Sequence, residues 1–225
     1  MAEKSSVFDM IGPVMIGPSS SHTAGVVRIA RAAVKLLGGI PDHAEITFYN
    51  SFASTYEGHS SDRAIVAGLM DFKTDDKRIK ESLDLAKDQG LSYTFKSVGN
   101  ASTLHPNTIK LVLKKGEKNL EVIGESRGGG MINIAEVNGF KADFTANLHT
   151  VIITAEDVKG SVAFLASVLA HDDCNIATMS VSRKGKNDVA CLVFEMDSGL
   201  KDVTLAYIRS LSWVNELIYI PDIDR

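Results

Sequence analysis

The feature that most constrains the fold is the order of apolar segments in the last third of the chain. Four segments have the alternating or continuous apolar residues of β-strands, namely residues 150–157, 175–183, 189–198 and 214–220. Two segments have apolar residues at helical spacing instead, namely residues 159–173 and 202–212. The resulting order, strand-helix-strand-strand-helix-strand, predicts a ferredoxin-like fold over residues 148–225.

The first part of the chain, residues 1–147, predicts a separate mixed α/β domain. Its helices are expected at residues 23–37, from Ser61 onward and at 75–90, and its first strand at 44–52. Residues 91–144 are expected to form three or four further strands with a turn at Asn138-Gly139. The whole chain is therefore expected to be of the α+β class, with a domain boundary near residue 147.

Composition excludes several kinds of function. The 225 residues are 44% hydrophobic and carry a net charge of −4, which argues against nucleic acid as a partner. No apolar run is long enough to span a membrane, and the first ten residues lack the apolar core of a signal peptide, so we expect a cytoplasmic protein. Cys174 and Cys191 have no metal-site spacing and lie in apolar segments, which predicts two core residues and no metal site.

The strongest candidate for a functional site lies at the start of the first helix. Ser19, Ser20, Ser21, His22 and Thr23 stand where backbone N–H groups and the helix dipole favour an anion. Thr23 or Ser21 is expected to be the N-cap. A serine beside a histidine is also a weak sign of a nucleophile and its base, but adjacent side chains at a helix start are expected to diverge. Serine-rich helix starts are common simply because serine caps well, so the structural alternative stays open.

Three further features of the sequence bear on this candidate site. Arg28, Arg31 and Lys35 add positive charge along the same helix. His59, followed by two serines, repeats the hydroxyl–histidine pattern at the second helix start, and the two starts either share a pocket or are unrelated. Gly128, Gly129 and Gly130 either wrap an anion or form a tight turn.

These motifs resemble those of the iron–sulfur-dependent L-serine dehydratase (L-serine ammonia-lyase) family. The resemblance is carried by IGPVMIGPSSSHTAGVVRIARAA, SFASTYEGHSSDRAIVAGL, the HPNT stretch and SRGGGMINI. Residues 148–225 resemble an ACT domain, through Asp157-Val158-Lys159-Gly160 between the first strand and helix and Asn175-Ile176 at the second strand. The arrangement is similar to the separate beta chain of the two-chain enzyme.

The resemblance implies an activity, a cofactor and partners. The reaction would convert L-serine to pyruvate and ammonia, with a [4Fe–4S] cluster whose thiolate ligands lie on a partner alpha chain. His22, and next His59, would be the catalytic groups, and Ser19, Ser20, Ser21 and Thr23 would bind the substrate carboxylate. The ACT domain would form dimers, and Asp157, Lys159, Gly160, Asn175 and Ile176 would be its effector site.

Two other functions fit the same residues. The chain could be a non-catalytic amino-acid-sensing protein, because it holds no complete catalytic set. It could also be a regulatory fragment of a serine-pathway oxidoreductase, since the first domain resembles the allosteric substrate-binding domain of some D-3-phosphoglycerate dehydrogenases. No GxGxxG motif follows a predicted strand, which argues against the second alternative.

Overall fold

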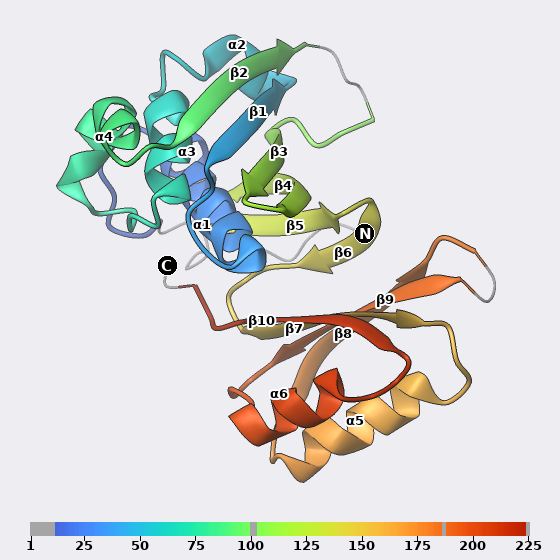
Figure 1. Ribbon diagram of the computed structural model, residues 1–225. Coiled ribbons are helices and arrows are strands. Elements are labelled where there is room, and N and C mark those ends of the chain that lie inside the picture. The colour runs from blue at the N-terminus through green and yellow to red at the C-terminus, as the bar shows by residue number, and fades with distance from the viewer. Residues whose placement is uncertain (1–11, 100–102, 186–187, 224–225) are drawn as a thin grey trace. The chain divides into compact units, whose positions relative to one another are not determined.

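The computed structural model describes residues 12–99, 103–185 and 188–223 and confirms the α+β class (Figure 1). The chain divides into two compact units, one up to Asn138 and the other Gly139–Ile223, and each is described by itself. This division falls in the turn before residue 140, whereas the sequence predicts a boundary near residue 147. The difference arises because residues 140–146 make most of their contacts with the second unit.

The first unit is built around a mixed sheet. Its helices and turns are a π-helical turn Ser20–Ala24, α1 Gly25–Leu37, α2 Ser51–Thr55, α3 Ser61–Leu69, a 3-10 turn Lys77–Glu81 and α4 Ser82–Asp88. Its strands are β1 His43–Tyr49, β2 Ser92–Val98, β3 Thr108–Lys115, β4 Lys118–Gly128 and β5 Met131–Val137, and the next strand, β6 Phe140–Phe144, belongs to the second unit. The order of the strands of this unit is β2-β1-β3-β4-β5, and β1 and β2 are parallel.

The sequence underestimated the strands of residues 91–144. Five strands, β2 to β6, occupy this range instead of three or four. The reason is that the chain reverses directly between β3 and β4, between β4 and β5 and at Asn138-Gly139, so each apolar stretch is divided by a tight turn.

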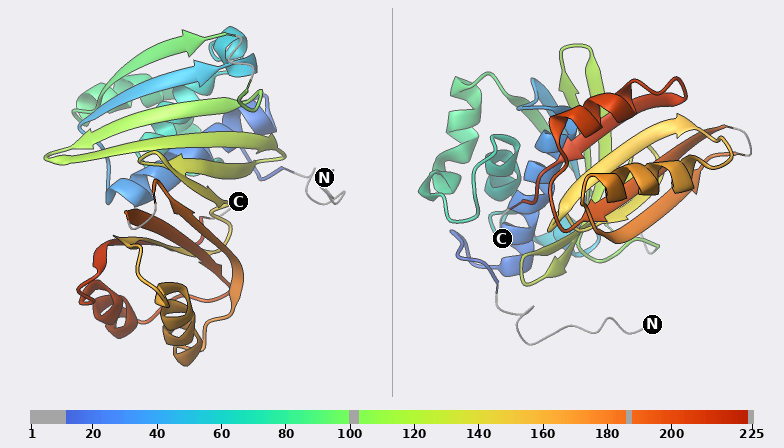
Figure 2. Two further views of the ribbon diagram at one scale, coloured as in Figure 1. Left: turned by 90° about the vertical axis from the view of Figure 1, so that its right-hand side faces the viewer. Right: turned by 90° about the horizontal axis from the view of Figure 1, so that it is seen from below.

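Helix α1 packs on β3, β4 and β5 on one face of this sheet and beside α3, as both views in Figure 2 show. Two glycines bring α1 and β4 into close contact. A Cβ on Gly25 would collide with the Oγ of Ser126, and a Cβ on Gly124 would lie 2.5 Å from Ile29 Cγ2. Gly38, with φ +83°, ends the helix as predicted.

The cationic side chains of α1 are not available at its N-terminal end. Arg31 Nε and Lys35 Nζ bind the two carboxylate oxygens of Asp71, at 3.1 and 2.5 Å. Arg28 is fully buried. Arg31 and Lys35, which the sequence singles out as positive charge along this helix, are therefore both paired with the carboxylate of Asp71, which follows α3.

The second unit has the predicted ferredoxin-like fold. Its elements are β7 His149–Glu156, α5 Ser161–His171, β8 Ile176–Arg183, β9 Val189–Met196, α6 Asp202–Arg209 and β10 Val214–Ile220. The strands form an antiparallel sheet in the order β10-β7-β9-β8, with both helices on one face (Figure 1). Val151, Ile153, Leu192 and Phe194 of the sheet meet Leu165 of α5 in the core.

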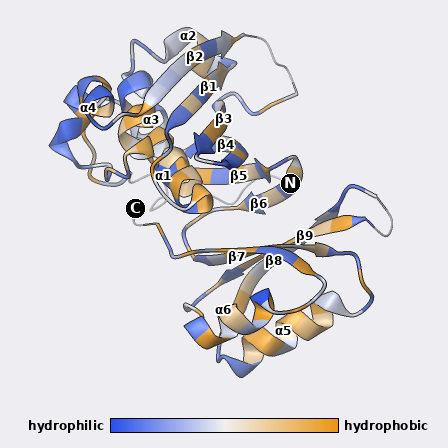
Figure 3. Ribbon diagram, in the orientation of Figure 1, coloured by the Kyte–Doolittle hydropathy of each residue, from blue (hydrophilic) through white to orange (hydrophobic). Residues whose placement is uncertain are grey.

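Both cysteines are buried core residues, which confirms that prediction. Cys174 follows α5 and Cys191 lies in β9. Figure 3 shows α1 largely in the colours of apolar residues, whereas α4 carries much of the blue of charged residues. Within the described ranges, no helix is long and apolar enough to cross a membrane.

Candidate functional site

The site begins at a helix start of unusual geometry. Ser19 is the N-cap, since its Oγ accepts a hydrogen bond from the N–H of His22 at 3.1 Å. The next five residues, Ser20–Ala24, form a π-helical turn before α1 continues. The prediction that Thr23 or Ser21 caps this helix is therefore wrong, because the helical turn begins two to four residues earlier, directly after Ser19. Such π-turns widen a helix locally and are frequent at functional sites.

The wide turn brings Ser21 and His22 together. Ser21 Oγ lies 2.9 Å from His22 Nδ1 and 3.3 Å from Ser19 Oγ. The expectation that these adjacent side chains diverge is wrong, since it assumed a regular α-helical start. Two hydroxyls and one imidazole thus form a connected polar chain at the N-terminal end of the helix.

His22 lies against His59 and Phe52. The ring centroids of His22 and His59 are 4.8 Å apart, and the Phe52 ring stands edge-on to His22 at 4.7 Å. Among the described residues, the Nε2 atom of His22 is buried without a hydrogen-bond partner. A buried polar atom without a partner is uncommon and points to a group that the chain by itself does not supply.

Two hydrogen bonds join the segments that carry the histidines. Ser61 Oγ donates to the carbonyl of His22 at 2.7 Å, and Thr23 Oγ1 donates to the carbonyl of His59 at 3.4 Å. Thr23 is fully buried. The two helix starts that carry the repeated hydroxyl–histidine motif are therefore neighbours in the structure.

The surroundings of His22 favour its neutral form. Burial, and then the nearby charge of His59, lowers the pKa of His22 below its usual value of 6.5. His59 Nδ1 lies 3.2 Å from the carbonyl of Thr55, which can only accept, so this hydrogen bond places a proton on Nδ1. The neutral ring of His22 can therefore act as a proton acceptor.

The glycine run forms the turn between β4 and β5 and lies beside the serines. Gly128, Gly129 and Gly130 all have positive φ, which the two-residue hairpin between Gly128 and Met131 requires. Ser126, just before the run, donates from Oγ to the carbonyl of Ser21 at 2.9 Å. Its own N–H donates to the carbonyl of Asn107 in the HPNT stretch. The motifs singled out in the sequence thus meet in one region.

The residues expected at an ACT effector site do not meet within one chain. Asp157 Oδ2 binds Arg183 at the end of β8, and Gly160 caps α5 with φ +83°. Asn175 binds Asp197, and Ile176 is the first residue of β8. The two groups lie at opposite ends of β8, an eight-residue strand, or about 26 Å apart along it.

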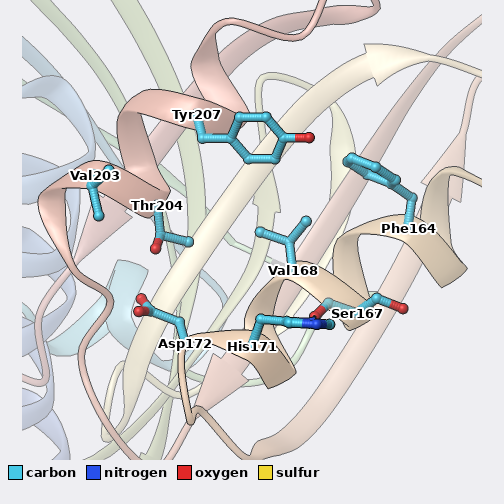
Figure 4. Close-up of a pocket in the computed structure, with 8 residues that line it drawn as sticks. All are labelled: Phe164, Ser167, Val168, His171, Asp172, Val203, Thr204 and Tyr207. Carbon is cyan, nitrogen blue, oxygen red and sulfur yellow. The ribbon is translucent and has the colours of Figure 1, made fainter.

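A separate hollow of about 450 Å³ lies between α5 and α6. Figure 4 shows Phe164 and Val168 of α5 facing Tyr207 and Val203 of α6 across it. Its remaining lining residues are Ser167, His171, Asp172 and Thr204. It contains none of the five residues predicted for the effector site.

Sequence reasoning missed three residues that shape the histidine site. Phe52 and Ser126 were not singled out, and Ser61 was taken only as a helix start. Phe52 is the one large apolar residue of the stretch SFAST, which is a weak signal of a buried anchor. Nothing in the local sequence indicates that Ser126 reaches Ser21, because 105 positions separate them.

Comparisons with known proteins agree with this assembly of motifs. The model of the family described as "Serine dehydratase beta chain" matches residues 6–136. A "Probable L-serine dehydratase, beta chain" from Bacillus subtilis is 42% identical over 217 residues, covering 96% of this chain and 98% of its own length. The "L-serine dehydratase, beta chain" of Peptoniphilus asaccharolyticus is 36% identical and covers 88% of this chain and 89% of its own length.

Two weaker likenesses concern parts of the chain. The "D-3-phosphoglycerate dehydrogenase" of Bacillus subtilis is 30% identical over 62% of this chain, but the match spans 25% of that enzyme. The ACT domain from GTP pyrophosphokinase of Chlorobium tepidum covers 32% of this chain and 95% of its own length, with 17% identity and a TM-score of 0.27.

Proposed function

Because this chain belongs to the serine dehydratase beta chain family, we propose that it is the beta subunit of an L-serine ammonia-lyase that forms pyruvate and ammonia together with an alpha chain. The observation that carries the proposal is the contact between His22 and His59, at 4.8 Å, directly beside the chain of serine hydroxyls. Elimination of water from serine requires groups that bind the substrate carboxylate and a group that accepts a proton.

The substrate carboxylate is assigned to the helix start. Hydroxyls of Ser19, Ser20 and Ser21 surround the N-terminal end of a helix that extends to Leu37, where the dipole favours negative charge. Thr23 belongs to this group through its hydrogen bond to the carbonyl of His59, which holds the second histidine segment against the first. The glycine turn at 128–130 lies next to the same serines, and we propose it as a further anion-binding loop.

His22 is the first candidate for proton transfer and His59 the second. Nδ1 of His22 is within hydrogen-bond distance of Ser21, and its Nε2 has no partner within the described part of the chain. The lowered pKa of His22 keeps the ring neutral and ready to accept a proton near pH 7. A positive charge on His59 disfavours protonation of His22, as the lowered pKa of His22 reflects.

This chain does not fit the family's [4Fe–4S] cluster. The described residues contain no group of three or more His, Cys, Asp or Glu side chains that could hold a metal ion. Burial raises the pKa of Cys191 to about 11, which disfavours the thiolate that a cluster needs, and Cys174 is buried as well. The proposal therefore places the cluster on the alpha chain.

The ferredoxin-like unit is proposed to pair with a second copy along β8. This strand is the edge of its sheet, and Met179 and Val181 on it are 47% and 49% exposed. Antiparallel pairing of two β8 strands would set Asn175 and Ile176 of one copy beside the Asp157–Gly160 loop of the other. Two chains would thus complete the effector site that one chain leaves divided.

Activity of the reconstituted enzyme tests the catalytic proposal. The chain is co-expressed with the alpha chain from the same genome, and pyruvate formation from L-serine is measured for His22→Ala, His59→Ala and the control His43→Ala. His43 lies on β1 against Ser92, away from the site. We expect about a 100-fold or larger loss of kcat for His22→Ala, as for other general acid–base groups, and normal turnover for the control.

Near-normal turnover of His22→Ala with the cluster's absorbance intact would remove His22 from the chemistry. An alpha chain that turns over serine at the same rate without this chain would favour the alternative of a non-catalytic, amino-acid-sensing subunit.

A further inference from the structure

Arg28 is a fully buried arginine in the middle of α1, and the proposed chemistry does not use it. Among the described residues, its side chain is the largest that is completely buried. Burying a guanidinium costs several kcal/mol unless its N–H groups find acceptors. An apolar residue would fill the same place in a helix interior without that cost, so the charge and its fork of donors call for a specific explanation.

The guanidinium binds the tip of the glycine turn. Nη1 of Arg28 donates to the carbonyl oxygen of Gly130 at 2.5 Å, across 102 positions of sequence. Gly129 and Gly130 have φ of +59° and +77°, so the turn uses a conformation that holds its carbonyl in one direction. Charged donors make the stronger hydrogen bonds of proteins, and burial strengthens this one further.

The same turn packs against the segment that carries the serines. A Cβ on Gly130 would lie 2.5 Å from Pro13 Cδ, and a Cβ on Gly12 would lie 3.1 Å from Ser20 Cβ and 3.7 Å from the carbonyl oxygen of Gly129. At the base of the turn, Ser126 Oγ donates to the carbonyl of Ser21. The segment from Gly12 to Ser21 is therefore held at both ends by one hairpin.

We propose that Arg28 is a positioning residue for the serine hydroxyls: by fixing the carbonyl of Gly130 it holds the β4–β5 turn against residues 12–21 and so sets the geometry of Ser19–His22. The inference rests on the proposed function for its catalytic consequence, but the mechanical link between Arg28 and the serines stands without it. Arg28 touches no reacting atom in this account and acts only through the turn.

Hydrogen exchange tests the mechanical link in the full chain. Arg28→Lys keeps the charge but replaces the fork by one shorter donor, and Arg28→Gln keeps a donor without charge. Arg31→Lys is the matched control, since Arg31 lies one turn further along α1 and binds Asp71 instead. We expect about tenfold faster amide exchange in residues 126–131 and also in 17–23 for both Arg28 variants, with exchange in the second unit and in the control unchanged.

Steady-state kinetics with the alpha chain test the consequence. A looser carboxylate grip weakens ground-state and transition-state binding alike, so KM for L-serine should rise about tenfold in Arg28→Lys while kcat stays within about twofold. Ser126→Ala, which removes the other hydrogen bond of the hairpin to the serine segment without touching a buried charge, should also speed exchange in 17–23 and raise KM.

The outcomes separate this inference from the proposed function. Faster exchange in 126–131 with unchanged exchange in 17–23 would overturn it, as would a KM no more affected than in Arg31→Lys. If neither Arg28 variant folds, the exchange of residues 17–23 in Ser126→Ala decides. Unchanged exchange there overturns the proposal that the β4–β5 hairpin sets the geometry of the serine segment, and faster exchange there supports it. If the reconstituted enzyme proves inactive on serine, the exchange result still decides the role of Arg28, while the proposed function fails alone.

Discussion

Replacing Gly25 by alanine should destabilise the first unit, although alanine is normally the better helix residue. Gly25 has ordinary helical dihedral angles, φ −61° and ψ −38°, so no backbone strain opposes the substitution. In an exposed helix the exchange would gain about 1 kcal/mol. Here the added Cβ would collide with Ser126 Oγ and lie 2.9 Å from Ser126 Cβ.

The cost follows from what Ser126 must give up. Its side chain is fully buried, and rotating Oγ away would break the hydrogen bond to the carbonyl of Ser21. Loss of that bond costs about 1 kcal/mol, and overpacking of a tight contact about 1–3 kcal/mol. After the gain in helix propensity, the free energy of unfolding should fall by about 1–3 kcal/mol.

Urea unfolding followed by far-UV circular dichroism measures this loss. Trp213 is the single tryptophan and lies in the second unit, so its fluorescence follows that unit separately. Gly99→Ala is the control, because a Cβ there meets nothing within 4 Å. The double variant Gly25→Ala/Ser126→Gly should recover at least about 1 kcal/mol relative to the sum of the single changes, since it removes the collision.

Unchanged or increased stability of Gly25→Ala would refute this reasoning. So would strict additivity in the double variant, because the loss would then not arise at the contact between α1 and β4.

Three more predictions concern ionisable groups. The pKa of His22 is lowered by burial and then by His59, so at acidic pH the unfolded chain takes up a proton that the folded chain does not. The contribution of His22 to the free energy of unfolding should therefore be fully present above pH 6.5 and be lost as the pH drops below it. His22→Gln should flatten that loss in a series of urea titrations at different pH. Glu195 is buried and its carboxylate accepts the N–H and Oγ1 of Thr145, so Glu195→Ala should lower the unfolding free energy by about 2–3 kcal/mol, whereas Glu216→Ala on exposed β10 should not. The pKa of Cys191 is about 11 because of burial, so mass spectrometry should find this thiol unmodified by iodoacetamide at pH 8 in the folded chain and modified in urea; rapid labelling of the folded chain would contradict the burial.

The fold of the second unit was accessible from sequence because its signals are local. Each strand and helix has its own apolar period, and the ferredoxin-like order leaves few ways to pair four strands. The first unit was harder to predict. The strands between residues 91 and 144 are separated by polar or glycine-containing turns that the sequence marks. Which strands pair, and the parallel pairing of β1 with β2, depend instead on contacts between distant residues.

The sequence by itself determined a set of candidate site residues and the chemistry that such residues favour. Ser19, Ser20, Ser21, His22 and His59 were identifiable as candidates because hydroxyls and an imidazole at a helix start favour an anion and a proton. Only the tertiary structure decided that the two histidines touch, that Ser19 rather than Thr23 caps the helix, and that Arg31 and Lys35 are paired with Asp71. The cap is a local bond across three positions. The other contacts join residues 36 to 105 positions apart, and no local propensity carries information over that distance.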